Sequence, residues 1–441
     1  MFINWNWQEE YKKKLTTPDE AVKIIKDGDR VVIGQAAAMP GALDNAFAKR
    51  KELKGVTAIT ALALRPIPFM SPKTDEYVGH IDTLGYFMGP QDNAYDAAHG
   101  GVSSVNFNLL DKWVPEIAKP NVLLLEVTPP DAHGYFNVGN VNACMLTQYR
   151  EYNPVIVVQV NKNVPFQYGE NVFIHVSEVE AIVEFDEPMP QLPFAPATDL
   201  ENKIASHIVD LIPDGACLQI GLGGIGNAVG YSLEHKKDLG VWTEMATDSM
   251  IHLAKKGVIN GSKMTTYPGK FVAAMGLGSQ EMYDFMNHNP FIYALPLYKI
   301  TGEQYIAQND NFVSINNCLS TDLTGQICSE TIGHKRVSTT GGQQGFVRGA
   351  IRSTGGKSFI LLASTAKDKD GNLLSRISLN LAPGTIVSTP RSDVQYIGTE
   401  WGCVNVFGLP PAERAKKIIT IAHPDFREQL TEEAKKAGIL K

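Results

Sequence analysis

The 441-residue sequence lacks several features that mark particular classes of protein. It has five cysteines and no Cys-x-x-Cys pair, which argues against a structural zinc site and against a disulfide framework. It has no run of about 18 apolar residues, so no transmembrane helix is expected. Basic residues do not predominate: there are 40 Lys and Arg against 47 Asp and Glu. The resulting net charge of −7 argues against a nucleic-acid or anionic-membrane partner.

The composition that remains is typical of a folded globular protein. Hydrophobic residues make up 44% and charged residues 20% of the chain, which excludes extensive disorder. The first residues contain neither the apolar segment nor the small-residue cleavage site of an export signal. Together with the unpaired cysteines, these features predict a reduced, cytoplasmic protein.

Short apolar runs rich in β-branched residues recur along the chain. Val31–Ile33, Val122–Val127 and Cys217–Ile220 are examples, and such runs are typical of parallel strands buried on both faces. Helix-like stretches lie between them. One starts at Thr17-Pro18-Asp19-Glu20, which has the residues of an N-cap, a first-turn proline and a capping box. The sequence therefore predicts the α/β class.

An internal repeat indicates two domains of one plan. Asp27-Gly28 and Gly34 match Asp214-Gly215 and Gly221, 187 residues later. A second pair, Asp131 to Gly134 and Asp322 to Gly325, matches at an offset of 191. Two matches at nearly one offset favour a duplication. We predict an N-terminal domain over 1–190 and a C-terminal domain over 191–441, joined by a Pro-rich linker at 187–196.

The first candidate site is a glycine loop that runs from Gly221 to Gly226, after an apolar strand and before a helical stretch. The free N–H groups of such a turn bind phosphates and other anions. The loop also satisfies Gly-x-Gly-x-x-Gly, and Glu244 lies 18 residues beyond it, near the place of a ribose-binding acid. An NAD-dependent oxidoreductase is therefore an open alternative at this point.

A second glycine cluster contains Gly341, Gly342 and Gly345, and Gly355-Gly356-Lys357-Ser358 follows it. The P-loop motif would require glycine where Ile351 stands, so we reject that interpretation. Tight turns beside a strand are the structural alternative. Two loops with free backbone donors in one domain could bind a phosphate at one and an oxyanion at the other.

Two glutamates have apolar or aromatic neighbours. Glu244 lies between Trp242 and Met245, and Glu400 precedes Trp401. Each could be an ordinary surface carboxylate. A partly desolvated carboxylate is, however, a better nucleophile or base than a hydrated one, which makes both residues catalytic candidates.

At these residues the sequence resembles the acetyl-CoA hydrolase/transferase family of class I coenzyme A transferases. The likeness is greatest to its butyryl-CoA:acetate and 4-hydroxybutyrate CoA-transferases, and it extends over nearly the whole chain. It rests on several motifs in order along the sequence. They include Asp131-Ala-His-Gly-Tyr-Phe-Asn137, the stretches 219–229 and 239–245, Ser314-Ile-Asn-Asn317, Gly341-Gly-Gln343, Gly355-Gly-Lys-Ser358 and Thr399-Glu400.

The resemblance implies two tandem α/β domains with the active site between them. It implies a CoA-transferase that moves CoA between a short-chain acyl-CoA and a carboxylate such as acetate, by a ping-pong reaction through a thioester on Glu244. That carboxylate is expected to be ionised near neutral pH. CoA is then a substrate, and no tightly bound cofactor or metal is expected. A homo-oligomer, specifically a dimer, is also implied. An acyl-CoA hydrolase on the same scaffold is the near alternative.

The resemblance also assigns roles to single residues. Glu244 takes the place of the catalytic glutamate, and Gly341-Gly342 match the loop that supplies an oxyanion-hole N–H. The expected CoA-binding residues are Gly221, Leu222, Gly223, Gly224, Ile225, Gly341, Gly342 and Lys357, and the further site candidates are Asn316, Gln343 and Glu400. Two positions depart from the family pattern, because Gly226 stands where relatives have Pro and Gly345 where they have Asp.

Overall fold

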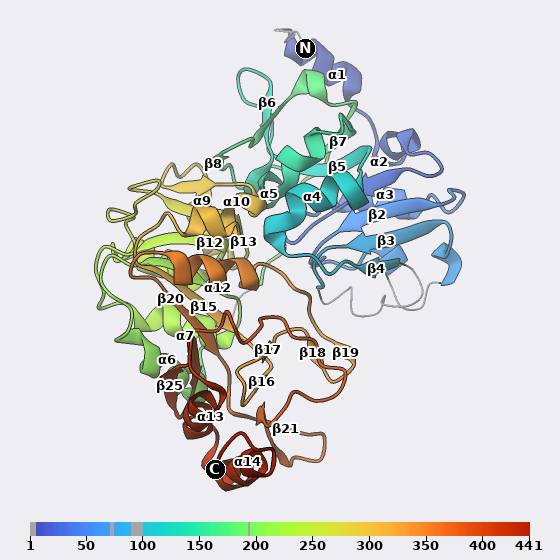
Figure 1. The fold of residues 1–441 in the computed structure, drawn as a ribbon. Coiled ribbons are helices and arrows are strands. Elements are labelled where there is room, and N and C mark those ends of the chain that lie inside the picture. Colours follow the sequence, from blue (N-terminus) through green and yellow to red (C-terminus); the bar gives the residue numbers. More distant parts are fainter. Residues whose placement is uncertain (1–5, 71–74, 90–99, 193–194) are drawn as a thin grey trace. The chain divides into compact units, whose positions relative to one another are not determined.

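The computed structural model describes residues 6–70, 75–89, 100–192 and 195–441 (Figure 1). The chain divides into two compact units. The first unit comprises Met1–Val105, Leu109–Leu192 and Ala273–Lys299, and the second comprises Asn106–Asn108, Pro193–Val272 and Ile300–Lys441. The predicted division at residue 190 therefore does not account for Ala273–Lys299, which groups with the first unit. Within the described ranges, no helix is long and apolar enough to cross a membrane.

The first unit is built on a parallel sheet whose neighbouring strands all run in one direction. Its order is β10 (Ala181–Glu184), β7 (Val155–Val160), β5 (Val122–Val127), β1 (Arg30–Val32), β2 (Val56–Thr60), β3 (Ile81–Gly85) and β4 (Gly100–Val102). Every residue of β5 is buried, as expected for a strand covered on both faces.

Helices and short strands complete this unit. They are α1 (Trp7–Lys14), α2 (Pro18–Ala21), α3 (Gly41–Ala48), α4 (Leu110–Trp113), α5 (Gly139–Arg150), β6 (Tyr135–Asn137), β8 (Tyr168–Gly169) and β9 (Phe173–His175). The Ala273–Lys299 region includes α9 (Gln280–Met286) and β14 (Ile292–Ala294), and β13 (Phe271–Gly276) leads into it. The predicted cap is present, since the Thr17 side chain accepts a hydrogen bond from the Glu20 N–H. The core packs Val31, Leu124 and Val157 against α3 residues such as Phe47.

The second unit contains strands in the order β25 (Gly402–Asn405), β24 (Tyr396–Thr399), β20 (Lys357–Leu361), β15 (Phe312–Asn317), β11 (Cys217–Ile220) and β12 (Gly240–Ala246). They are parallel except for the β24–β25 pair. The α/β class is therefore confirmed. Its longer helices are α6 (Asp199–Val209), α7 (Gly224–Ser232), α8 (Asp248–Lys255), α12 (Gln343–Arg352), α13 (Pro411–Thr420) and α14 (Pro424–Lys436).

Shorter elements lie between β15 and β24. They are β16 (Ser320–Asp322), β17 (Ile327–Cys328), β18 (Thr331–Ile332), β19 (Lys335–Arg336), β21 (Thr365–Lys367), β22 (Leu373–Ser375) and β23 (Ile377–Ser378). They form small separate sheets, and those of their strands that carry labels in Figure 1 (β16 to β19 and β21) lie below β15 and β20 in that view.

The predicted repeat is present in the topology. The order β10-β7-β5-β1-β2 in the first unit matches β24-β20-β15-β11-β12 in the second. The turns before β1 and β11 also share their hydrogen bonds. Asp27 Oδ1 accepts from the Lys54 N–H at 2.9 Å, and Asp214 Oδ1 accepts from the Lys237 N–H at 2.9 Å. Gly28 and Gly215 have φ of +78° and +73°, a conformation that only glycine adopts readily.

The second pair of matched turns is equally alike. The Asp131 carboxylate accepts from the N–H groups of His133 and Tyr135, and Asp322 accepts from those of Thr324 and Gln326. Each turn closes by a glycine N–H donating to the aspartate carbonyl, at 3.1 and 2.9 Å. Both matches found in the sequence therefore mark the same structural device in each half.

Candidate active site

The carboxyl edge of the second sheet brings together the strongest candidates. In the β11–β15 register Ile220 lies opposite Ile315, so Gly221 and Asn316 follow at the same level. The β11–β12 register pairs Cys217 with Gly240, and its extension places Gly221 level with Glu244. Because carboxyl ends of parallel strands share one edge, three adjacent strands present these residues there.

The Glu244 carboxylate lies directly against the N-terminus of α12. Gly342 is the N-cap of that helix, and a β-carbon added to it would stand 2.3 Å from Glu244 Oε2. The same point is 2.8 Å from Thr301 Cγ2 and 3.2 Å from Phe346 Cε2. Any side chain at position 342 would therefore displace the carboxylate or its neighbours.

The carboxylate of Glu244 is desolvated without being paired. Glu244 is largely surrounded by protein, although it is the most exposed residue of β12. Across the part of the chain that the structure describes, its side chain has no hydrogen-bond or ion-pair partner. Burial alone raises its pKa from 4.5 to about 7. At neutral pH the Glu244 carboxylate is therefore less completely ionised than an ordinary glutamate.

Backbone donors face the same point. The Gly341 carbonyl accepts from the Phe107 N–H at 3.1 Å, and Gly341 has φ of +60°. Among the described residues no acceptor exists for the N–H groups of Gly341 and Gly342. They stand at the N-terminus of a ten-residue helix, whose dipole and free N–H groups favour negative charge. An oxyanion formed beside Glu244 would meet these donors.

The glycine loop after β11 presents a second set of donors. The Gly221 N–H donates to the Ile315 carbonyl at 2.7 Å, and Gly223 has φ of +120°, a region that side chains disfavour. The N–H groups of Leu222 and Gly223 have no acceptor in the described ranges. The loop leads into α7, whose first N–H groups are also free of intrahelical partners. The loop therefore presents free backbone N–H groups, the kind of donor that binds anions at a helix N-terminus.

Both departures from the family pattern have a steric reason in this conformation. A β-carbon on Gly226 would lie 2.1 Å from the Gly221 carbonyl oxygen. A β-carbon on Gly345 would lie 2.0 Å from the Thr301 carbonyl oxygen. Only glycine fits at either position with the backbone as it stands. The backbone around α7 and α12 therefore requires glycine at both positions.

Two further candidates line this edge in structural roles. Asn316 and Gln219 exchange amide hydrogen bonds of 3.1 and 3.2 Å, and both side chains are buried. Gln343 donates from Nε2 to the Thr389 hydroxyl at 3.1 Å. The amide pair supports the backbone beneath Gly221, since a β-carbon there would lie 3.5 Å from Asn316 Oδ1.

The structure does not bring Glu400 and Lys357 to Glu244. Glu400 is 5% exposed, and its carboxylate accepts hydrogen bonds from the N–H and hydroxyl of Ser364. It follows β24, four strand spacings or roughly 19 Å from β12. Lys357 starts β20 at the opposite edge, where its ammonium donates to the Leu211 carbonyl at 2.6 Å. Their carboxylate and ammonium groups are occupied by structural contacts.

Sequence reasoning missed three residues of this region. Thr301 packs beside Gly342, Glu201 packs against Gly224, and Asn317 donates from Nδ2 to the Leu222 carbonyl at 2.9 Å. Glu201 belongs to the capping box that starts α6 at Thr198, and Thr301 precedes Gly302-Glu303, but neither pattern indicates contact with a glycine loop. Asn317 follows Asn316 within the Ser314–Asn317 motif, but the sequence does not show that its side chain is directed toward the glycine loop.

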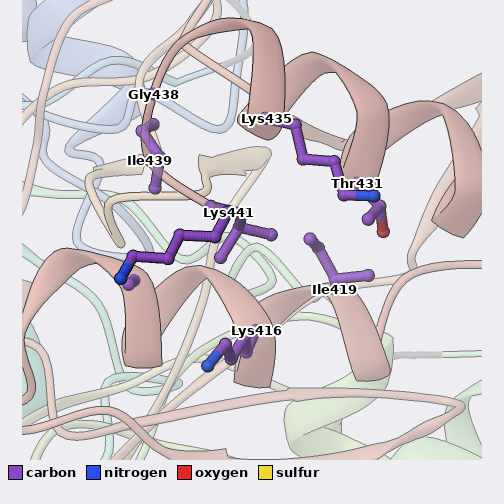
Figure 2. A pocket seen from close by; sticks show the side chains of 9 residues that line it. Lys416, Ile419, Thr431, Lys435, Gly438, Ile439 and Lys441 are labelled. Atoms are coloured by element: carbon purple, nitrogen blue, oxygen red, sulfur yellow. The ribbon is translucent and has the colours of Figure 1, made fainter.

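A separate pocket lies between α13, α14 and the last residues of the chain (Figure 2). Apolar side chains such as Ile419 and Ile439 line it, together with Lys416, Lys435 and Lys441. Glu413 and Glu432 pair with Lys416 and Lys435 at 3.1 and 3.2 Å, so two of these charges are already compensated. None of the candidate catalytic or CoA-binding residues lines this pocket.

Comparison with known proteins identifies the family. The model of the acetyl-CoA hydrolase/transferase N-terminal domain matches residues 3–77 and 111–193, and that of the C-terminal domain matches residues 278–434. The chain is 40% identical over 438 residues to succinyl-CoA:cyclohexane-1-carboxylate CoA transferase of Geobacter metallireducens, covering 98% of this chain and 97% of the relative. It is 38% identical over 446 residues to butyryl-CoA:acetate CoA-transferase of Anaerostipes caccae, covering 98% of each.

A solved structure agrees with this result. RipA from Yersinia pestis superposes with a TM-score of 0.90 at 36% identity, over 98% of this chain and 99% of that chain. The parallel sheets, the repeated topology and the sequence matches over nearly the full length lead to one conclusion. The chain belongs to the acetyl-CoA hydrolase/transferase family.

Proposed function

We propose that the protein is a CoA-transferase that carries CoA on Glu244 between a short-chain acyl-CoA and a carboxylate. The observation that carries this proposal is the position of an unpaired, desolvated carboxylate against the free N–H groups of Gly341 and Gly342. The Glu244 carboxylate, as nucleophile, is thus a direct neighbour of the backbone that would stabilise the oxyanion. The names of the relatives, which are CoA-transferases, support the same reaction class.

The reaction balances without an external acid or base. A Glu244 oxygen attacks the thioester carbonyl, the carbon–sulfur bond breaks, and CoA leaves as a thiolate. The thiolate attacks the Glu244 carboxyl carbon of the resulting anhydride and displaces the first acid as a carboxylate. The incoming carboxylate attacks the Glu244 thioester carbonyl, and the released thiolate then attacks the new acyl group. Each half-reaction starts from an anion and ends with one.

Each attack creates a tetrahedral oxyanion that the backbone donors can stabilise. Removal of one oxyanion-hole donor typically costs about 3–4 kcal/mol of transition-state stabilisation. The donors are rigidly held, since Gly341 is tied to Phe107 and Gly342 starts α12. The glycine loop at Gly221 to Ile225 supplies further N–H groups, which we assign to CoA. Binding energy from the long CoA molecule can then be used at the reacting carbon.

Short-chain substrates such as butyryl-CoA, 4-hydroxybutyryl-CoA and acetate are proposed from the relatives rather than from a shaped pocket. We assign no direct CoA contact to Lys357, whose ammonium is bound to the Leu211 carbonyl. The proposal does not use the Gly221–Gly226 loop for NAD. Glu244, which would bind the ribose in that case, packs instead on Gly342.

Steady-state kinetics test this proposal. With butyryl-CoA and acetate, wild type should give the parallel double-reciprocal lines of a ping-pong reaction. Glu244→Gln should lower turnover at least about 1000-fold while acyl-CoA still binds. Glu413→Gln, which removes an exposed carboxylate of the same unit, is the matched control and should match wild type. Retention of a tenth of the activity by Glu244→Gln would refute the role of Glu244.

A further inference from the structure

Asn317 fixes the orientation of one peptide unit in the glycine loop. It ends β15, and its side-chain amide donates to the Leu222 carbonyl at 2.9 Å. The carbonyl and N–H of a trans peptide point in opposite directions. The Gly223 N–H, which belongs to the same peptide, therefore points away from Asn317. This N–H has no acceptor within the described residues.

Two contacts tie the loop to β15. The Gly221 N–H donates to the Ile315 carbonyl at 2.7 Å, and the Asn317 amide holds the next peptide but one. Gly223 has φ of +120°, and a β-carbon on it would lie 3.1 Å from Asn317 Nδ2. The Asn317 amide therefore packs against Gly223, whose backbone conformation is rarely adopted by residues other than glycine.

The repeated half of the molecule shows the alternative arrangement. The registers of β1 with β5 and of β11 with β15 make Glu126 the counterpart of Asn317. Among the described residues, Glu126 makes no hydrogen bond to the corresponding loop of the first unit, and its Oε1 instead accepts from the Asn161 side-chain amide at 2.8 Å.

The corresponding helix in the first unit is closed at its N-terminus. The Gly41 N–H donates to Glu187 at 2.8 Å, and the Ala42 N–H donates to Gln159 at 2.9 Å. The first unit thus satisfies its own helix donors, whereas the loop donors of the second unit are free. The unit whose loop donors are free is thus the one that has a side-chain amide, that of Asn317, at this position.

We propose that Asn317 is a positioning residue that holds the Leu222–Gly223 peptide with its N–H toward bound CoA. The inference rests on the proposed function of the loop. It predicts that Asn317 controls capture of acyl-CoA and leaves the chemical steps at Glu244 unchanged. In a ping-pong reaction this separation is measurable, because kcat/KM for acyl-CoA reports only the first half-reaction.

The test compares Asn317→Ala and Asn317→Asp with wild type. Loss of one hydrogen bond that orients the loop should lower kcat/KM for acyl-CoA about five- to tenfold. Asn317→Asp keeps the shape but places an oxygen against the Leu222 carbonyl, so its loss should be larger. The maximal rate and kcat/KM for the acceptor acid should stay within about twofold. Ser329→Ala is the matched control, since it removes a 3.3 Å hydrogen bond to the Asn317 carbonyl and should match wild type.

Calorimetry with free CoA separates this inference from the proposed function. If wild type binds CoA but transfers none, the proposed function fails, while a weaker affinity of both variants would still support the positioning role. If both variants bind CoA as tightly as wild type, the positioning role is refuted. It is also refuted if the maximal rate and both kcat/KM values fall by the same factor.

Discussion

Replacement of Glu244 by glutamine should stabilise the protein, and the gain should depend on pH. Burial raises the pKa of Glu244 from 4.5 to about 7. The folded state therefore holds a proton that the unfolded state releases between these values, and stability falls as pH rises through this range. At about 1.4 kcal/mol for each pKa unit, the ionised carboxylate costs up to about 3 kcal/mol above pH 7. Glutamine keeps the shape and has no charge to desolvate.

Differential scanning calorimetry at several pH values measures this effect. For a unit of 150–250 residues, 1 kcal/mol corresponds to about 2–4 °C in Tm, so Glu244→Gln should raise Tm by roughly 6–12 °C at pH 8. The gain should shrink to about a quarter of that value at pH 5, because wild type is then protonated in the folded state and the unfolded carboxyl is only partly protonated. An equal gain at both pH values would refute the reasoning, because it would indicate a packing effect. A lower Tm for Glu244→Gln at pH 8 would refute it as well.

Three further predictions follow from the same geometry. Gly342→Ala should lower kcat at least about 100-fold with little change in CoA affinity, because its methyl group would meet Glu244 Oε2; steady-state kinetics and calorimetry measure the two quantities. Gly101→Ala, whose methyl group would meet nothing within 4 Å, is the control. A kcat of Gly342→Ala within threefold of wild type would contradict the prediction. The kcat/KM for acyl-CoA should fall tenfold for each pH unit below about 7 and level off above it, because only the ionised carboxylate attacks; a rate profile that is flat from pH 5 to 8 contradicts this. In the first unit, burial raises the pKa of Asp44 and of Glu126 from their ordinary values to about 8, so stability is lost as pH rises from about 4 to about 8. The double variant Asp44→Asn, Glu126→Gln should therefore gain more Tm over wild type at pH 9 than at pH 5, and equal gains would contradict the prediction.

The features predicted correctly are those carried by local pattern. Buried apolar runs gave the parallel strands, and the Asp-Gly turns at Asp27 and Asp214 marked the repeat, because turn chemistry is read within a few residues. The glycine loop at Gly221 was visible for the same reason. Glu244 was visible through its apolar neighbours and through the family resemblance.

What the sequence could not give is contact between distant segments. The grouping of Ala273–Lys299 with the first unit depends on packing rather than composition. The Glu400 carboxylate accepts a hydrogen bond from Ser364, and the Lys357 ammonium donates one to the Leu211 carbonyl. No sequence motif predicts either partner. Thr301 reaches Gly342 from another part of the chain. A polar residue with a promising sequence environment can therefore act in the site only if its side chain is not already hydrogen-bonded to another part of the fold.

The same limit explains the pKa of Glu244. Apolar neighbours indicated partial desolvation, but the closeness of Gly342 and the lack of a charged partner in the described residues are properties of the fold. They decide that the carboxylate titrates near pH 7 rather than near its ordinary value.

The most direct test of the account is the mass of the intact protein after incubation with butyryl-CoA in the absence of an acceptor acid. The account predicts a covalent adduct of the mass of CoA on wild type, at Glu244, that disappears on addition of acetate and never forms on Glu244→Gln. An adduct that decays in water at the rate of turnover would identify a hydrolase instead. The absence of any adduct on wild type that nevertheless transfers CoA would contradict the central role of Glu244.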